Sequence, residues 1–173
     1  MLWKSIARNL LTRHPPATTA DADLARTLSA RVKAAGRKRL GRSLSIRHIA
    51  AGSCNGCELE LRATRNLIYD LAQYGLSFTA SPRHADILLI TGTANINMRE
   101  AVIQTHAAMP APAFVVAVGD CAVDGGVFKD SPVVAGGAAE FLPVDLVIGG
   151  CPPSPLLIVQ GLLALLEASG SNF

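Results

Sequence analysis

The sequence predicts an α/β protein of the flavodoxin-like class, in which helices cover both faces of a parallel sheet, preceded by a basic, partly helical N-terminal arm. From Ser45 onward, short apolar runs alternate with helical patterns, as in chains that wind a parallel sheet. Residues 86–91 form a nearly continuous apolar run, as expected for a strand covered on both faces. Residues 1–48 contain eleven Lys and Arg and two acidic residues, whereas the remainder contains five basic and eleven acidic residues.

Five strands and three helices follow from this alternation. The strands are expected at residues 46–51, 77–80, 86–91, 113–118 and 145–148, and the helices at 58–74, at 97–108 and from Pro155 onward. The core-facing stripe of the first helix is expected to consist of Leu59, Leu67, Ile68, Leu71 and Tyr74. Ser154 is expected to cap the last helix, with Pro155 at the first position, where a missing N–H has no consequence.

The chain is expected to divide into an arm with a linker, residues 1–44, and an α/β domain, residues 45–173. Residues 2–13 can form a short basic amphipathic helix that contains Trp3. Such a helix suits a membrane surface or a docking site on a partner protein, and both interpretations remain open. Nucleic acid is not an expected partner, because the arm has no aromatic interleaving beyond Trp3. The rest of the arm is expected to contain a linker at 15–24 and a second basic helix at 23–40.

The composition points to a protein with either a large core or a surface covered by partners. Half of the 173 residues are hydrophobic, and the mean hydropathy is +0.33. The most apolar window, residues 155–166, is too short for a membrane span and suits a buried helix. The N-terminus has no pattern of an export signal, so the protein is expected in the cytoplasm. Cysteines in that compartment are more typical of metal or cluster ligands than of disulfides.

The four cysteines all follow predicted strands. Cys54 and Cys57 follow the first strand, Cys121 follows the fourth, and Cys151 follows the fifth. Because the carboxyl ends of parallel strands meet at one edge of a sheet, we expect the four thiols to lie together there.

Four thiolates are the ligand set of a [4Fe–4S] cluster, one for each iron. Glycines before the ligands, such as Gly56, Gly119 and Gly150, allow backbone to approach a bulky cluster. A structural zinc site with four cysteine ligands is the alternative, and it would make the protein a zinc-stabilised assembly adaptor. Zinc sites usually contain two closely spaced cysteine pairs, whereas here two ligands come singly, which favours the cluster.

Six motifs occur in order along the α/β part of the chain. They are Cys54-Asn-Gly-Cys57-Glu-Leu-Glu60, the segment from Ser81 to Gly92, Gly119-Asp-Cys121, Gly125-Gly-Val-Phe128, Val144-Asp145 and Gly150-Cys-Pro-Pro-Ser-Pro155. Together they resemble the small subunits of membrane-bound, energy-converting [NiFe] hydrogenases of the formate hydrogenlyase and hydrogenase-4 type. This family is homologous to the B (20 kDa) subunit of respiratory complex I. The resemblance covers about residues 47–167, and the N-terminal arm matches only loosely.

The resemblance implies a subunit that passes electrons and has no turnover of its own. Its single proximal [4Fe–4S] cluster would relay electrons between a large subunit that holds the Ni–Fe site and ferredoxin-like iron–sulfur subunits. Membrane subunits would hold the complex on the inner face of the cell membrane. Complex I subunits of this family carry two adjacent cysteines at the first ligand position, whereas this chain has the hydrogenase-like Cys-x-x-Cys. A complex I-type subunit that passes electrons to quinone is the alternative.

Other polar residues have less defined roles. Glu58 and Glu60 follow the ligand loop and could form part of a proton path or could be interface carboxylates in the first turn of a helix. Asp120 and Asp124 are expected to shape the Cys121 loop, and Arg83 to contact a partner. Three histidines are expected to be structural: His48, His84 and His106.

Overall fold

The computed structural model describes residues 43–168, and these residues form a five-stranded, fully parallel sheet. The order of its strands is β2-β1-β3-β4-β5, which is the flavodoxin-like order. All five expected strands are confirmed, with ends shifted by at most two residues. Their bounds are β1 Leu44–Ala50, β2 Leu76–Phe78, β3 Ile87–Thr91, β4 Phe114–Val118 and β5 Leu146–Ile148. The elements expected at residues 2–13, 15–24 and 23–40 lie outside the described residues.

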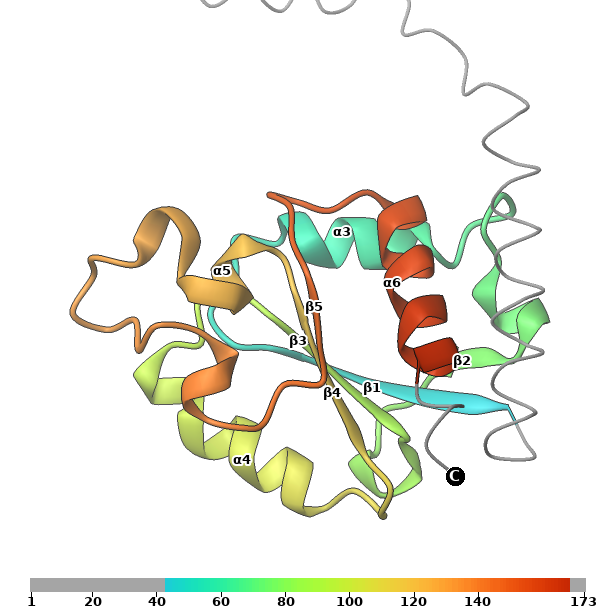
Figure 1. Cartoon of the computed structure of the whole chain (residues 1–173), viewed down its shortest axis with the longest axis horizontal. Helices are drawn as coiled ribbons and strands as arrows, with labels where there is room; N and C mark the ends of the chain where they lie inside the picture. Colours follow the sequence, from blue (N-terminus) through green and yellow to red (C-terminus); the bar gives the residue numbers. More distant parts are fainter. Residues whose placement is uncertain (1–42, 169–173) are drawn as a thin grey trace, which may run out of the picture.

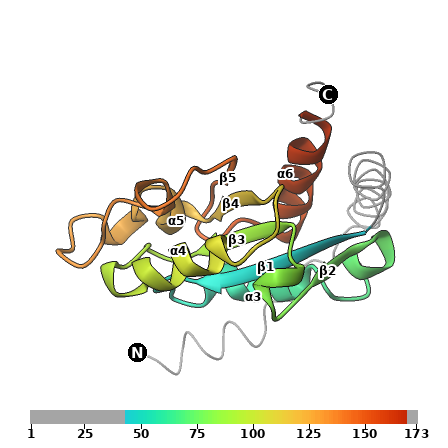
Figure 2. The same ribbon diagram turned by 90° about the horizontal axis from the view of Figure 1, so that it is seen from below.

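Within residues 43–168, four α-helices cover the two faces of the sheet: α3 Gly56–Ala63, α4 Arg99–Ala107, α5 Asp120–Asp124 and α6 Pro155–Ala168. Helices α3 and α6 lie on one face, and α4 lies on the other (Figure 1). The short α5 packs on the same face as α4, because its Ala122 is buried in that layer. The turned view in Figure 2 shows β2 near one border of the sheet and β5 near the other.

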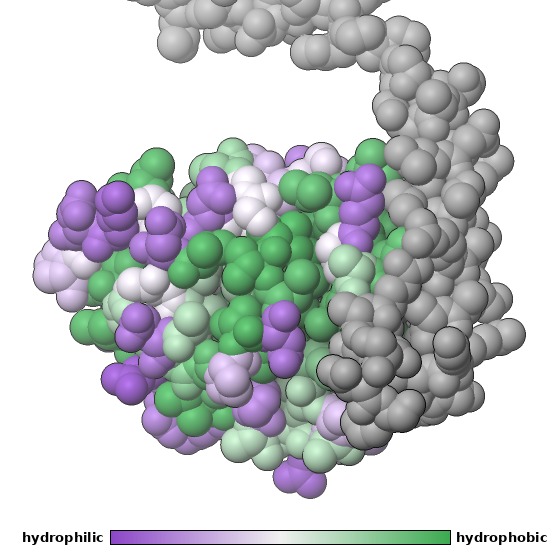
Figure 3. All heavy atoms as spheres, viewed as in Figure 1, coloured by the Kyte–Doolittle hydropathy of each residue, from purple (hydrophilic) through white to green (hydrophobic). Residues whose placement is uncertain are grey.

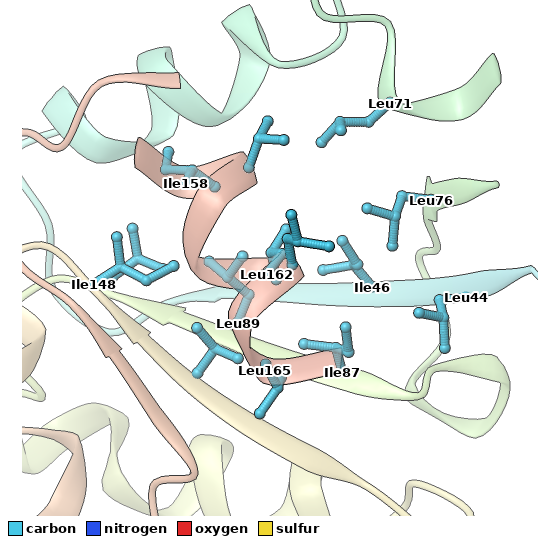
Figure 4. Packing of buried hydrophobic residues seen from close by; sticks show 14 of the residues in the cluster. Leu44, Ile46, Leu71, Leu76, Ile87, Leu89, Ile148, Ile158, Leu162 and Leu165 are labelled. Atoms are coloured by element: carbon cyan, nitrogen blue, oxygen red, sulfur yellow. The ribbon is translucent and has the colours of Figure 1, made fainter. Parts of the chain in front are cut away.

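The larger part of the core lies between the sheet and helices α3 and α6. Residues of α6 such as Ile158 and Leu162 are at most 1% exposed and point toward Ile46 and Leu89 of the sheet (Figure 4). Complete burial of a Leu or Ile side chain contributes about 1.5–3 kcal/mol, so this layer contributes substantially to the stability of the fold. A second core lies on the α4 face and includes Leu88, Ile90, Val102 and Val115.

The chain leaves helical geometry after Ala63, so the prediction of one helix over 58–74 is wrong. The Asn66 side chain accepts hydrogen bonds from the backbone N–H groups of Ile68, at 2.9 Å, and Tyr69, at 3.1 Å. This local turn competes with helix formation, and the segment ends in a 3₁₀ helix, η1, at Leu71–Tyr74.

The predicted stripe on this helix is therefore also wrong in large part. Leu59, Leu67 and Ile68 are 54%, 94% and 42% exposed, whereas Leu71 is 1% exposed. The side chain of Tyr74 lies outside the described part of the structure.

The remaining helices agree with their sequence signals. The segment 97–108 forms a 3₁₀ turn, η3 Ile96–Met98, followed by α4. Ser154 caps α6 as expected, because its Oγ accepts a hydrogen bond from the Leu157 N–H at 3.3 Å. Helix α5, directly after β4, has no counterpart in the sequence prediction.

Part of the apolar composition lies on the surface. Hydrophobic residues gather in the middle of one face, over β5 (Figure 3). Exposed side chains on β5 and α6 include Val147 and Leu157, which are 51% and 42% exposed. No helix within residues 43–168 is both long and apolar enough to cross a membrane.

Candidate iron-sulfur site

The structure places the four cysteines at one edge of the sheet, beyond the carboxyl ends of its strands. Cys54 lies in the loop after β1, and Cys57 lies in the first turn of α3. Cys121 lies in the first turn of α5, directly after β4, and Cys151 lies in the loop after β5. None of the four forms a disulfide. The loops that carry the cysteines meet at this edge because all five strands are parallel and end there.

Close contacts between backbone and sulfur join the loops. A side-chain carbon on Gly119 would overlap with Cys57 Sγ, and one on Gly56 would lie 3.5 Å from Cys54 Sγ. Gly119 also has a φ of +88°, which side chains rarely adopt. Only glycine therefore allows the loop after β4 to approach Cys57 this closely.

Hydrogen bonds hold the Cys121 loop against the Cys151 loop. The Asp120 carboxylate accepts a hydrogen bond from the Gly150 N–H at 2.6 Å, and the Asp120 N–H donates to the Gly150 carbonyl at 2.9 Å. Asp124 accepts from the Gly126 N–H at 2.8 Å and closes the turn after α5. Both aspartates thus shape the Cys121 loop, as expected from the sequence.

Burial and neighbouring thiols change the ionisation of Cys57 and Cys121. Burial raises the pKa of Cys57 to about 11, and the charges of Glu58, Cys121, Cys54 and Cys151 contribute to this increase. Burial also raises the pKa of Cys121, with added contributions from Cys151 and Cys54. Four thiolates gathered in one place would repel one another, and a metal centre would supply the positive charge that offsets this repulsion.

Four thiols are the donor chemistry of either an iron–sulfur cluster or a zinc ion, and these two groups need different spacings between the sulfurs. Within residues 43–168, no three Cys, His, Asp or Glu side chains converge closely enough to hold one metal ion. A tetrahedral zinc site would draw four sulfurs to within about 3.8 Å of one another, given a Zn–S distance of about 2.3 Å. A cubane holds each thiolate on a separate iron and therefore needs a wider set of ligands.

A buried carboxylate lies directly beside Cys57 in the sequence. Glu58 is 9% exposed, and its Oε1 accepts a hydrogen bond from the Thr91 hydroxyl at the end of β3. His48 Nε2 lies 2.9 Å from Thr91 Oγ1 and 3.9 Å from Glu58 Oε1. The other oxygen, Oε2, is buried and has no hydrogen-bond partner in the described part of the chain.

Burial and these contacts shift the pKa values of Glu58 and His48. Burial raises the pKa of Glu58, but the hydrogen bond from Thr91 is among the contacts that outweigh it, so the pKa lies below its ordinary value. Burial lowers the pKa of His48 although the nearby Glu58 charge raises it. The expected structural role of His48 agrees with this geometry. Thr91 could not be recognised in the sequence, because its contact with Glu58 joins residues 33 positions apart.

The other residues predicted from the sequence lie away from this network. Glu60 is half-buried on α3, two residues beyond Glu58. Arg83 and His84 are exposed on the 3₁₀ helix η2, Pro82–His84. His106 lies in the last turn of α4, on the other face of the sheet.

A cavity of about 210 Å³ borders Cys54. Its lining includes Phe128 and Val133, which are 48% and 41% exposed, and the adjacent Val127 is 80% exposed. Apolar surface thus continues directly from the edge that carries the cysteines.

The sequence from Cys54 to Leu165 matches the family model described as NADH ubiquinone oxidoreductase, 20 kDa subunit. The chain belongs to this family. All four cysteines lie inside the matched residues 54–165.

Similar proteins come from two kinds of complex. The chain is 40% identical over 130 residues to a probable membrane-bound hydrogenase subunit of Pyrococcus furiosus, covering 75% of this chain and 78% of that protein. It is 39% identical over 141 residues to formate hydrogenlyase subunit 7 of Escherichia coli, covering 80% of this chain and 55% of that protein. It is 45% identical over 112 residues to the B-type subunit of the NADH-quinone oxidoreductase of Clostridium beijerinckii, covering 64% of this chain and 66% of that protein.

Solved structures agree with the fold. A chain of the membrane-bound sulfane sulfur reductase, an archaeal respiratory membrane complex, superposes with a TM-score of 0.68 at 30% identity and covers 83% of this chain and 77% of that one. A chain of an NAD⁺-reducing [NiFe]-hydrogenase gives a TM-score of 0.58 at 22% identity over 73% of this chain and 93% of that one, a likeness of fold. The family and these relatives make this chain a subunit of an oxidoreductase.

Proposed function

We propose that this chain is the iron–sulfur electron-transfer subunit of a membrane-bound [NiFe] hydrogenase and that Cys54, Cys57, Cys121 and Cys151 hold one [4Fe–4S] cluster. The observation that carries the proposal is the meeting of four thiols, from three loops, at one edge of the sheet, where the other three affect the ionisation of Cys57. When bound, the cluster would supply one-electron transfer. The chain's own loops orient the thiols, of which Cys54 and Cys151 are exposed.

The two-residue spacer between Cys54 and Cys57 supports a hydrogenase rather than a quinone reductase, because complex I subunits of this family carry two adjacent cysteines at this position. Asn55 adopts a left-handed conformation, with a φ of 71°, directly before α3 begins. This conformation is tolerated by asparagine, and it lets a two-residue spacer turn Cys57 into the first turn of the helix. A complex I-type subunit that reduces quinone is the second candidate, because subunits of that type match at similar identity.

Partners would cover the edge that carries the cysteines. The exposed Val127, Phe128 and Val133 beside it fit a large subunit that shields the cluster from water. Ferredoxin-like subunits would exchange electrons with the cluster, and membrane subunits would hold the complex at the cytoplasmic face of the membrane. Residues 2–13 are the segment proposed to lie at the membrane surface.

Glu58 is the better of the two proposed proton-path residues. It is buried, hydrogen-bonded to Thr91 and adjacent to Cys57, so a proton moving through it would pass close to the electron carrier. Its Oε2, which has no partner within residues 43–168, can accept a proton or a hydrogen bond from a partner or a water molecule. Glu60 is less buried and is proposed only as an interface carboxylate.

Metal analysis of the purified complex tests the proposal. We expect about four iron atoms and about four acid-labile sulfides assigned to this subunit. Nickel should be present in the large subunit that co-purifies with it. A nickel-free large subunit together with quinone reduction would establish the second candidate, and one zinc per chain without sulfide would establish an assembly adaptor instead.

A further inference from the structure

A second cavity lies beside α3, next to the site described above. Its volume is about 250 Å³, and its walls come from β1, from α3 with the residues after it, and from the end of β2. Three of its lining side chains are arginines: Arg47, Arg62 and Arg65. The remaining lining residues are His48, Glu58, Leu61, Phe78 and Thr79.

Within residues 43–168, the three guanidinium groups have no carboxylate partner. None of them forms an ion pair with another residue that the structure describes. The Nε of Arg47 is buried and has no hydrogen-bond partner there. Buried donors in native proteins are almost always satisfied, so this atom indicates a missing acceptor. The one acidic residue in the lining, Glu58, already receives a hydrogen bond from Thr91 and lies 3.9 Å from His48.

The charge at this cavity contrasts with the rest of the described chain. Residues 43–168 contain six Lys and Arg against eleven Asp and Glu, a net charge of −5. Half of the six positive side chains line this one cavity. A localised positive cavity on an acidic domain favours a negatively charged ligand.

Apolar side chains adjoin the arginines along the sequence. Leu59 lies three residues before Arg62 on α3, and residues at this spacing are neighbours on a helix surface. Leu67 and Ile68 follow closely after Arg65. All three are exposed, at 54%, 94% and 42%, which is unusual for leucine and isoleucine gathered in one segment. Arginine beside exposed apolar residues is the composition of protein–protein interfaces.

We infer that this cavity is a docking site for an acidic segment of another subunit of the complex, with an Asp or Glu carboxylate held between Arg47, Arg62 and Arg65. The flanking Leu59, Leu67 and Ile68 contact apolar residues of the same segment. Arg65 is prepared for this role, because its guanidinium carbon lies 5.8 Å from the centre of the Phe78 ring and is held there by a cation–π contact. The inference rests on the proposed function, since it requires that the chain works within a complex.

Other occupants fit less well. The cavity is smaller than the roughly 300–1,000 Å³ that encloses most organic ligands, so it suits a single side chain better than a ring system with a tail. The chain's own residues 1–42 contain ten Lys and Arg and two acidic residues, and they would be repelled by three arginines.

Two substitutions in the full complex test the inference. Arg65→Glu reverses a charge in the cavity, and Arg99→Glu is the matched control. Arg99 is likewise exposed and lies over a phenylalanine, Phe141, at 5.5 Å, but on α4 on the opposite face of the sheet. We expect Arg65→Glu to reduce the retention of one other subunit about tenfold on purification, whereas Arg99→Glu changes nothing. High salt should weaken retention of the same subunit in the wild type. The EPR signal per copy of this chain should remain unchanged in both variants.

A photo-cross-linking residue at position 67 identifies the contacting segment. We expect the cross-link to reach an acidic stretch of the subunit that Arg65→Glu releases. Exchanging the acidic residue there for arginine should restore retention in the Arg65→Glu background. The inference is wrong if Arg65→Glu behaves like Arg99→Glu, if the cross-link reaches residues 1–42, lipid or a segment without acids, or if the charge exchange fails to rescue. If the wild-type complex shows no EPR signal from a cluster, that result counts against the proposed function and not against the docking site.

Discussion

The two ends of helix α3 differ in how their sites are built. At its start, the cysteine edge is built from backbone: glycines that allow close approach and hydrogen bonds between the loops that carry Cys121 and Cys151. Toward its end, the arginine cavity is lined by three long arginine side chains, two of which are exposed. The helix that joins them has only eight residues.

The contrast shows where precision is needed. A cluster requires four sulfurs at fixed positions, so its loops tolerate little change. A docking carboxylate can follow a flexible guanidinium group, so the cavity tolerates rearrangement and acts through charge. Substitutions at the cysteine edge should therefore remove function outright, whereas substitutions near the cavity should change assembly by degrees.

Replacing Cys121 with Ser should have the largest effect. A serine hydroxyl is a poor substitute for a thiolate ligand of iron, so the cluster should be lost or converted and electron flow should stop. The partner subunits should still assemble, because the cavity at the other end of α3 is intact. EPR spectra and subunit content of the purified complex measure both parts. An unchanged EPR signal in this variant would overturn the ligand assignment.

Replacing Gly119 with Ala should have the next largest effect. The new methyl group would overlap with Cys57 Sγ at a backbone φ of +88°, and such strain costs about 1–3 kcal/mol. We expect lower iron content and a lower melting temperature. Gly149→Ala is the control, because its nearest contact would be Asp120 Oδ1 at 3.4 Å and its backbone is not left-handed. Equal cluster occupancy in the two variants would contradict the view that this edge depends on backbone approach.

The cysteine edge could be predicted from the sequence because apolar runs identify strands and parallel topology gathers their ends. Parallel topology alone was enough to predict that Cys121 and Cys151 lie near Cys54 and Cys57. The cavity could not be predicted, because it depends on where α3 ends. The pattern of Leu59, Leu67 and Leu71 suggested a continuing helix, and the turn made by the Asn66 side chain decided otherwise.

Long-range polar contacts were equally beyond prediction. The bond between Thr91 and Glu58 joins the end of β3 to α3, and neither residue type indicates it. Burial of Glu58 depends on the same packing of α3 on the sheet. The spacing of hydrophobic residues predicts helices and strands, but it does not predict which polar side chains form hydrogen bonds between them.

Replacing Thr91 with Val should have an intermediate effect, by removing the donor to a buried carboxylate. Loss of that hydrogen bond should lower the free energy of unfolding by about 1–3 kcal/mol at pH 7. Thr93→Val is the matched control, because Thr93 Oγ1 donates to an uncharged acceptor, the Gly52 carbonyl, at 3.2 Å. Urea unfolding of the purified chain measures both variants.

The Thr91 variant should also change the dependence of stability on pH. The pKa of Glu58 lies below its ordinary value of 4.5, so its ionised form stabilises the folded chain above that pH. This contribution is lost as the pH falls through the folded-state pKa. We expect the destabilisation in Thr91→Val to shrink on acidification below pH 4.5, while that of Thr93→Val stays constant. A pH-independent difference for both would show that Thr91 acts through packing alone.

Replacing Leu67 with Ala should have the smallest effect on the chain itself. Its side chain is 94% exposed, so the free energy of unfolding should change by less than about 0.5 kcal/mol. Leu71→Ala, four residues later and 1% exposed, should cost about 2–5 kcal/mol in the same urea titration. Within the complex, Leu67→Ala should weaken retention of the subunit that docks at the arginine cavity more than Leu71→Ala does. The reason is that Leu67→Ala removes an apolar contact with that subunit. A loss of stability from Leu67→Ala as large as that from Leu71→Ala would mean that this leucine belongs to the core and not to a docking surface.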